Sequence, residues 1–202
     1  PVSVFRCDVV LPGRDTEADV NISDFVTRLL YSVIMTGVAP KSLYARTVDQ
    51  DRGHALFGGV RADVLAELVV SAREHTDSGY AVYNAFNYAD SNVSLDTFVH
   101  WLSKAGIPVE RLEYADWLAQ VETRLDALSL NERKYSIAPM LDAFRKPFPG
   151  GQAVPHFAEF RELVRAEFGF DDVLKITETY FGDYLRALAG AFFKQAGIAL
   201  EL

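Results

Sequence analysis

The sequence has nine tyrosines, whose phenols could take part in acid–base chemistry if a cation lay beside them. A phenol can exchange a proton with a carbonyl oxygen near neutral pH when a neighbouring cation lowers its pKa. A lysine four residues further along a helix would supply that cation on the same face. No tyrosine here has a lysine at that spacing: Tyr31 is followed by Met35, for example, and Tyr180 by Tyr184. This arrangement for proton transfer is therefore missing from the sequence.

Other short motifs typical of catalytic or ligand-binding sites are also absent from the sequence. It contains no GxGxxG turn for a dinucleotide pyrophosphate, and no GxxxxGK[ST], HExxH, GxSxG or CxxC. The histidines are scattered without the spacing of metal ligands, at His54, His75, His100 and His156. We expect neither a metal site nor a complete nucleotide site in these residues.

The composition predicts a folded domain that does not bind nucleic acid. Half of the 202 residues are apolar and 24% are charged, which is enough to build a core. The net charge of -8 and the pI near 5.0 argue against contacts with phosphates. A single cysteine, Cys7, no long apolar run and no secretion signal fit a cytoplasmic protein without a membrane partner.

The elements that must position any site begin with the β-rich run at residues 2–11. A strand this apolar needs neighbours on both sides, as in a parallel sheet, and we therefore expect the chain to be part of a longer protein. Apolar spacing and capping residues predict helices at about 24–37, 63–73, 94–104, 115–128, 132–144, 157–168 and 179–195. Strands are predicted at 80–87 and 108–114, and residues 41–59 are expected to be irregular.

Several blocks of this sequence, taken together, resemble a known family. They include "VSVFRCDVVL", "TGVAPKSLY", "LDTFVHWLSKAGIPVERLEYADWL" and "ALSLNERKYSIAPML". In order, and over nearly the whole chain, they resemble the C-terminal part of the thioester reductase domain of carboxylic acid reductases. They are similar, more loosely, to the terminal reductase domains of nonribosomal peptide synthetases. Both belong to the extended short-chain dehydrogenase/reductase class.

The resemblance implies a role in a multidomain enzyme. In that family an adenylation domain activates an acid with ATP, a carrier domain holds it as a phosphopantetheine thioester, and the reductase domain uses NADPH to release an aldehyde. The cofactor turn and the catalytic tyrosine–lysine pair lie upstream in the family, so the resemblance implies no catalytic residue in this chain. We therefore expect residues 1–202 to be one α/β domain: the mostly helical, substrate-binding C-terminal subdomain of a Rossmann-type reductase, with a few residual parallel strands. Its partners would be the upstream Rossmann half and the carrier domain, and alone it should be inactive.

The resemblance also implies which residues lie near the cofactor. The segment after the first strand lies against the nicotinamide in the family, which makes Cys7, Asp8 and Val9 the cofactor-side candidates. The alternative for Asp8 is a structural role, as the partner of an arginine or the cap of a turn.

Two further segments are candidates for the substrate side. Lys41, Ser42 and Tyr44 follow the TGVAP block and would line the pantetheine entrance, unless they are simply an exposed lysine and a packed tyrosine. Phe57, Gly58 and Gly59 match a loop that usually carries an aspartate between the phenylalanine and the glycine. Gly58 removes that carboxylate and adds backbone freedom, which leaves the role of the loop open.

The aromatic residues of the middle segment are expected to form the core of a helical cap over the active site; a substrate tunnel or a carrier-docking surface is the alternative. These residues are Phe98, Trp101, Tyr114 and Trp117.

Two other functions stay open at this point. The chain could be a noncatalytic module that docks a carrier protein or another partner through an exposed sheet edge. It could also be the C-terminal half of another extended short-chain reductase, such as a nucleotide-sugar enzyme. Because its strands would lack neighbours on one side, we expect self-association of the isolated chain.

Overall fold

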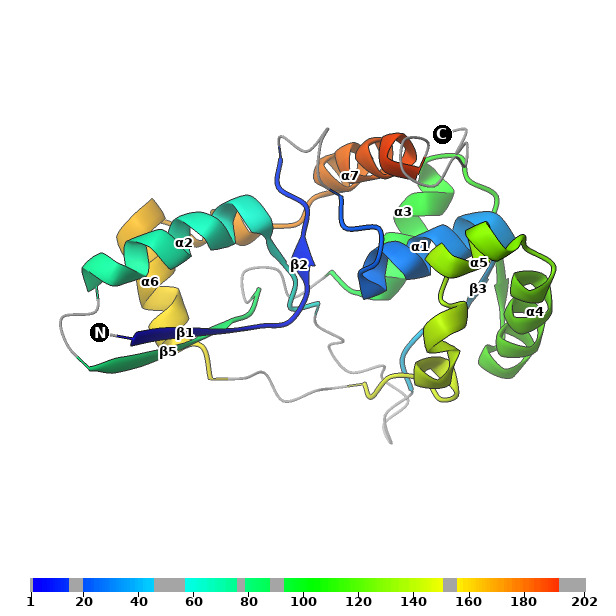
Figure 1. The fold of residues 1–202 in the computed structure, drawn as a ribbon, viewed down its shortest axis with the longest axis horizontal. Helices are drawn as coiled ribbons and strands as arrows, with labels where there is room; N and C mark the ends of the chain where they lie inside the picture. Colours follow the sequence, from blue (N-terminus) through cyan, green and yellow to red (C-terminus); the bar gives the residue numbers. More distant parts are fainter. Residues whose placement is uncertain are drawn as a thin grey trace.

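The computed structural model describes residues 2–14, 20–45, 57–75, 79–87, 93–150 and 156–192, and Figure 1 shows their arrangement. The elements in chain order are β1 (Val2–Cys7), β2 (Val10–Leu11), α1 (Phe25–Thr36), β3 (Val38–Pro40), β4 (Val60–Arg61), α2 (Ala62–His75), β5 (Tyr80–Ala85), α3 (Leu95–Lys104), β6 (Glu110–Leu112), α4 (Tyr114–Asp126), α5 (Leu130–Tyr135), η1 (Ala138–Phe144), α6 (Ala158–Phe168), η2 (Asp171–Leu174) and α7 (Glu178–Ala191). The strands pair as β1–β5, β2–β4 and β3–β6, and each pair is parallel. The predicted class, mostly helical with a few short parallel strands, is confirmed.

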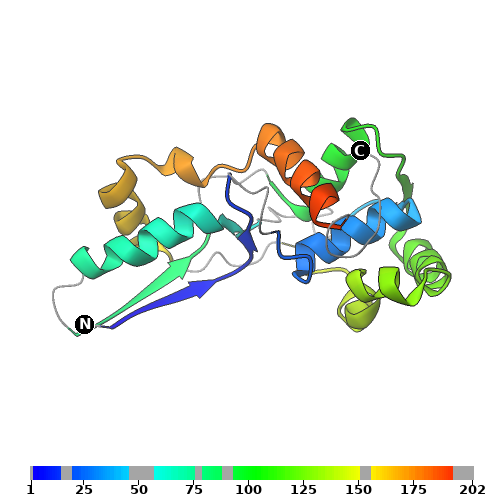
Figure 2. The same ribbon diagram turned by 45° about the horizontal axis from the view of Figure 1, so that its top comes forward.

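The buried side chains form two separate clusters. The smaller, here called the sheet cluster, joins β1 and β5 to α2 and α6 and includes Val64, Leu68, Tyr83, Phe160 and Leu163. The larger, here called the helical cluster, joins α1, α3, α4 and α7 and lies at the other end of the molecule, with β2 between the two ends (Figures 1 and 2).

Helices cover one face of the β1–β5 pair. Side chains alternate between the two faces of a strand, and Phe5 and Tyr83 stack at 4.9 Å between ring centroids on the face that α2 and α6 cover. The opposite face begins with Val2 and Tyr80, which are 57% and 65% exposed. Among the described residues, the sheet therefore has a helical layer on one side only.

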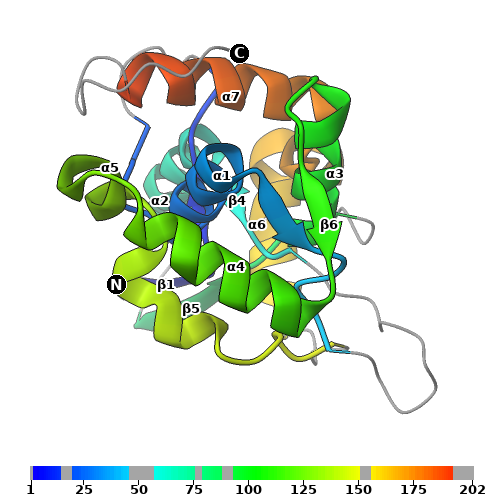
Figure 3. The same cartoon turned by 90° about the vertical axis from the view of Figure 1, so that its right-hand side faces the viewer.

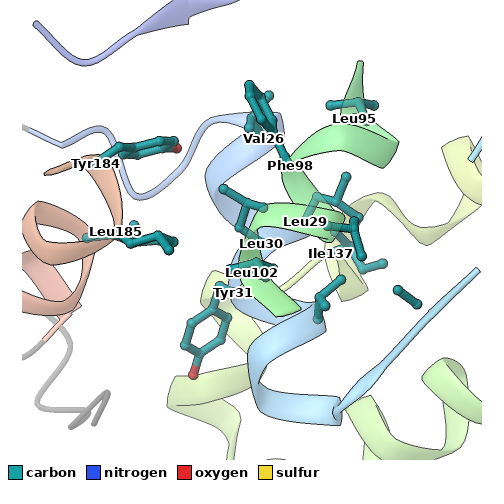
Figure 4. Close-up of a cluster of buried hydrophobic side chains, with 14 of the residues drawn as sticks. Val26, Leu29, Leu30, Tyr31, Leu95, Phe98, Leu102, Ile137, Tyr184 and Leu185 are labelled. Atoms are coloured by element: carbon teal, nitrogen blue, oxygen red, sulfur yellow. The ribbon is translucent and has the colours of Figure 1, made fainter. Parts of the chain in front are cut away.

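The helical cluster is built around α1, whose two ends are set by its sequence. Asp24 caps the first turn by accepting from the amides of Val26 and Thr27, and Gly37 ends the helix in the left-handed conformation with φ of 67°. Figure 4 shows side chains of α1, α3 and α7 meeting in this cluster, and Figure 3 shows β6 beside the helices at this end.

Most helices lie where the sequence predicts them, but one predicted helix and one predicted strand were wrong because each is interrupted. The predicted helix at 132–144 is broken at Ser136 into α5 and the 3-10 helix η1, which has a proline in its first positions. A proline there cannot donate to the preceding turn, so the α-helix cannot continue through it. The predicted strand at 2–11 is interrupted after Cys7, because the chain leaves β5 and pairs with β4 instead.

Strands β3 and β4 were not predicted. The predicted end of the last helix, at Gln195, lies outside the described residues. In the part of the chain that the structure describes, no helix has both the length and the apolar content needed to cross a membrane.

Candidate functional site

The carboxyl ends of β1 and β5 lie side by side. The two strands are parallel, and their last residues, Cys7 and Ala85, are partners in the register. In open parallel sheets, ligands bind outside the carboxyl ends of the strands. This end of the sheet, followed by Asp8 on one strand and Phe86 on the other, is therefore the first place to look for a site.

Asp8 and the Phe57–Gly59 loop meet at this end. The backbone amide of Gly58 donates to the Asp8 carboxylate, and its carbonyl accepts from the amide of Asn87 at 3.0 Å. Desolvation outweighs that hydrogen bond and raises the pKa of Asp8. No arginine of the described residues forms an ion pair with Asp8.

Gly58 is held in a space that has no room for a side chain. A Cβ atom at this position would lie 2.2 Å from the ring of Phe86 and 2.5 Å from the carboxylate of Asp8. Where the resemblance leads us to expect an aspartate, the chain therefore has a close backbone contact with Asp8. Gly58 does not have a positive φ. A glycine is therefore needed here because it leaves room for Phe86 and Asp8, and not because the backbone takes a conformation that other residues avoid.

The other two cofactor-side candidates flank Asp8. Cys7 is an exposed free thiol whose pKa is raised by desolvation. The carbonyl of Val9 accepts from the amide of Val60 at 2.9 Å, which starts the β2–β4 pair. Val9 therefore has a backbone role, and only Cys7 and Asp8 present polar side chains here.

The substrate-side candidates Ser42 and Tyr44 are tied to the first turn of α3. The Ser42 hydroxyl donates to one carboxylate oxygen of Asp96 at 2.6 Å, and the amide of Leu43 donates to the other at 2.8 Å. The amide of Tyr44 donates back to the Ser42 hydroxyl at 3.1 Å. Lys41 instead pairs with Glu113 at 2.5 Å on the surface, in agreement with the alternative that it is simply an exposed lysine.

Tyr44 connects the two groups of candidates. Its hydroxyl accepts from the amide of Leu95 at 3.2 Å. Burial first, and then the negative charges of Asp96 and Asp8, raise the pKa of Tyr44 to about 12, against the hydrogen bond from Leu95, which lowers it. The amide of Phe57, next to the glycine that contacts Asp8, donates at 3.0 Å to the carbonyl of Val93, two residues before Leu95. Hydrogen bonds through the Phe57–Gly59 loop and the start of α3 therefore link Asp8 to Tyr44.

The aromatic residues of the middle segment are mostly core, as expected. Phe98 and Trp117 are fully buried, and Trp101 and Tyr114 are half-buried. Phe98 stacks on Phe181 at 5.2 Å and also meets the edge of Phe57 at 4.9 Å. The core of the helical cluster therefore reaches the Phe57–Gly59 loop directly.

Asp96 is the residue of this site that sequence reasoning missed. It lies in the first turn of α3, where an acidic side chain usually stabilises the helix dipole in solvent. Its partners on the 41–45 segment are more than fifty positions away, so no local signal could have identified it.

Two surface grooves lie away from these residues. One, of about 570 Å³, follows the first half of β5 and is lined by Tyr80, Val82, Glu159 and Glu162 among others. The other, of about 430 Å³, runs between α2 and α6 past Glu67 and Val70. Neither contains a candidate residue, and the first lies toward the amino end of its strand. Because ligands bind at the carboxyl ends of parallel strands, we assign the site to the Asp8–Tyr44 region.

Comparison with known proteins identifies related chains, although no protein-family model matches this one. A carboxylic acid reductase from Mycobacterium marinum is 36% identical over 148 residues, and an isonitrile lipopeptide synthase from Mycobacterium tuberculosis is 38% identical over 178 residues. The crystal structure of the reductase (R) domain of a nonribosomal peptide synthetase from Mycobacterium tuberculosis superposes with a TM-score of 0.81 and 32% identity, over 94% of this chain. The chain is homologous to part of a reductase domain. This homology confirms the resemblance to these reductase domains that the sequence indicates.

The homology covers only a share of each relative. The match spans 13% of the Mycobacterium marinum carboxylic acid reductase, 7% of the isonitrile lipopeptide synthase and 46% of the R-domain chain. The chain thus corresponds to somewhat under half of a reductase domain, within enzymes that are many times longer.

Proposed function

We propose that this chain is the substrate-side subdomain of an NADPH-dependent thioester reductase, which releases a carrier-bound acyl group as an aldehyde. The observation that carries the proposal is the series of hydrogen bonds that links Asp8, at the end of a parallel strand, through the Phe57–Gly59 loop and the start of α3 to Tyr44. Homology to the reductase domains of carboxylic acid reductases and peptide synthetases supports it.

The residues divide between a cofactor side and a substrate side. NADPH would supply the hydride, and Cys7, Asp8 and Val9 would form the edge of the site against its nicotinamide. The exposed thiol and the carboxyl at a strand's carboxyl end fit that position. Ser42, Tyr44 and the Phe57–Gly59 loop would line the path of the phosphopantetheine arm. Lys41 would lie at the outer end of this path, where Glu113 already pairs with it.

The rest of the cofactor site would come from a Rossmann half encoded upstream. This chain has no glycine-rich pyrophosphate turn, and β1 is paired on one side only among the described residues. The free edge of β1 would accept a neighbouring strand of that half, and the carrier domain would approach the helical cluster. Residues 1–202 would then form one structural unit that is inactive alone.

The proposal is tested by titrating NADPH into two proteins by calorimetry: this chain, and this chain joined to the upstream half. We expect binding only by the joined protein, together with NADPH-dependent reduction of an acyl-phosphopantetheine thioester. Tight binding to the chain alone would contradict the division of the site. If neither protein binds NADPH, the chain is better explained as a noncatalytic docking module.

A further inference from the structure

Among the described residues, none accepts the proton of the Tyr44 hydroxyl, which itself accepts from the amide of Leu95. The side chain is half-buried. With a pKa of about 12, the phenol stays protonated at neutral pH and can only donate through this proton.

The kind of atom that could accept this proton depends on the negative charge around it. The Asp96 carboxylate is bonded to the Ser42 hydroxyl and to the amide of Leu43, the residue before Tyr44. Its charge and that of Asp8 raise the pKa of Tyr44, so further negative charge near the phenol oxygen is unfavourable. A phosphate or carboxylate ligand would meet the same repulsion. The acceptor that fits is therefore a neutral carbonyl oxygen.

The position of the hydroxyl is fixed by a closed set of hydrogen bonds. Asp96 holds both Ser42 and Leu43, and Ser42 in turn accepts from the amide of Tyr44. Ser94 and Thr97 cap α3 reciprocally, which leaves the next amide, that of Leu95, to donate to the phenol. The 42–44 segment and the first turn of α3 thus hold the hydroxyl from two directions.

We propose that Tyr44 donates a hydrogen bond to an amide carbonyl of the pantetheine arm, and that Asp96 is the positioning residue that holds it there. This inference rests on the proposed function and adds to it the group that recognises the arm. An amide carbonyl is neutral, and pantetheine carries two amides along its length. The phosphate of the arm would lie away from this pair of carboxylates.

Tyr44→Phe tests the inference in the chain joined to its upstream half. We expect KM for an acyl-pantetheine thioester to rise roughly two- to tenfold, the range for one neutral hydrogen bond, with kcat unchanged. KM for an acyl thioester of a simple alkyl thiol, which has no amide, should not change. Tyr80→Phe removes an exposed hydroxyl at the far end of β5 and is the matched control, expected to leave both substrates unaffected.

Asp96→Asn tests the positioning role. An asparagine can still accept from Leu43, but its amide group cannot accept the Ser42 proton, so the tyrosine is held less firmly. We expect the same substrate-dependent rise in KM, smaller than for Tyr44→Phe, and little further rise when the two changes are combined. Thermal unfolding of each variant shows whether a loss of folding contributes.

The outcomes separate this inference from the proposed function. If the unchanged protein reduces no thioester, both fail. If it is active but Tyr44→Phe leaves KM unchanged, alters kcat alone, or affects the alkyl thioester equally, only the inference fails.

Discussion

At the scale of single residues, the tightest contact is at Gly58. We expect Gly58→Ala to destabilise the protein by about 1–3 kcal/mol, because the new methyl group would overlap the ring of Phe86 and the Asp8 carboxylate. Gly182→Ala is the control: it lies within α7, where the nearest atom to a new Cβ is a flexible arginine end at 3.9 Å. That change should stabilise the helix by up to about 1 kcal/mol. Urea unfolding of both variants makes the comparison, and equal effects would contradict it.

A second residue-level prediction concerns pH. Burial raises the pKa of Asp24 above its ordinary value of 3.8, so the folded state favours the protonated carboxyl. The stabilisation is fully present below pH 3.8 and is lost as the pH rises through the folded pKa. Asp24→Asn, which still caps α1, removes this dependence. The unfolding free energy of the wild type relative to this variant should therefore fall as the pH rises from about 3 to 7. A rise over the same range would show that the cap is favoured as the anion.

At the scale of elements, α7 holds the larger cluster together. Leu188 is fully buried in it, and Tyr184 shares a hydrogen bond of 2.5 Å with Thr27 of α1. We expect Leu188→Ala to cost about 2–5 kcal/mol by leaving a cavity. Arg186→Ala, on the exposed side of the same helix, should change the stability by less than about 0.5 kcal/mol. Thermal unfolding of the two variants checks this, and similar losses would mean that α7 is only loosely docked.

Helix positions could be predicted from local signals, whereas strand pairing could not. Asp24, Ser94 and Gly37 mark helix ends by chemistry that acts within a few residues. Strand β3 has only three residues, Val38–Pro40, and exists because β6 lies beside it. The break at Ser136 could have been anticipated, because Pro139 was visible in the sequence but was outweighed by the apolar spacing around it.

The candidate site was predictable only in part for the same reason. Its two segments, around Asp8 and around Tyr44, came from the resemblance, and their roles stay predictions. The second segment is held by Asp96, whose carboxylate accepts hydrogen bonds from the Ser42 hydroxyl and from the Leu43 amide. Such contacts leave no periodicity or spacing in the sequence.

At the scale of the whole molecule, the open face of the β1–β5 pair predicts self-association. Val2 and Tyr80 expose more than half of their surface at the same end of this pair. We expect the isolated chain to sediment as a concentration-dependent mixture, and Val2→Lys with Tyr80→Lys to reduce the association. Leu130→Lys, at an 89% exposed position on α5, is the control and should change nothing. A chain that stays monomeric at all concentrations would contradict the prediction.

The strand pairs of the described residues are all parallel, which affects how the chain reaches this structure. Val2 pairs with Tyr80 and Val38 with Glu110, so neither pair can begin as a local hairpin. Each pairing must wait until a long loop has closed, and contacts between distant residues slow folding. During synthesis β1 leaves the ribosome before β5 and stays without this partner until α2 and β5 have followed. We therefore expect slow refolding from denaturant, with the helices forming before the strands.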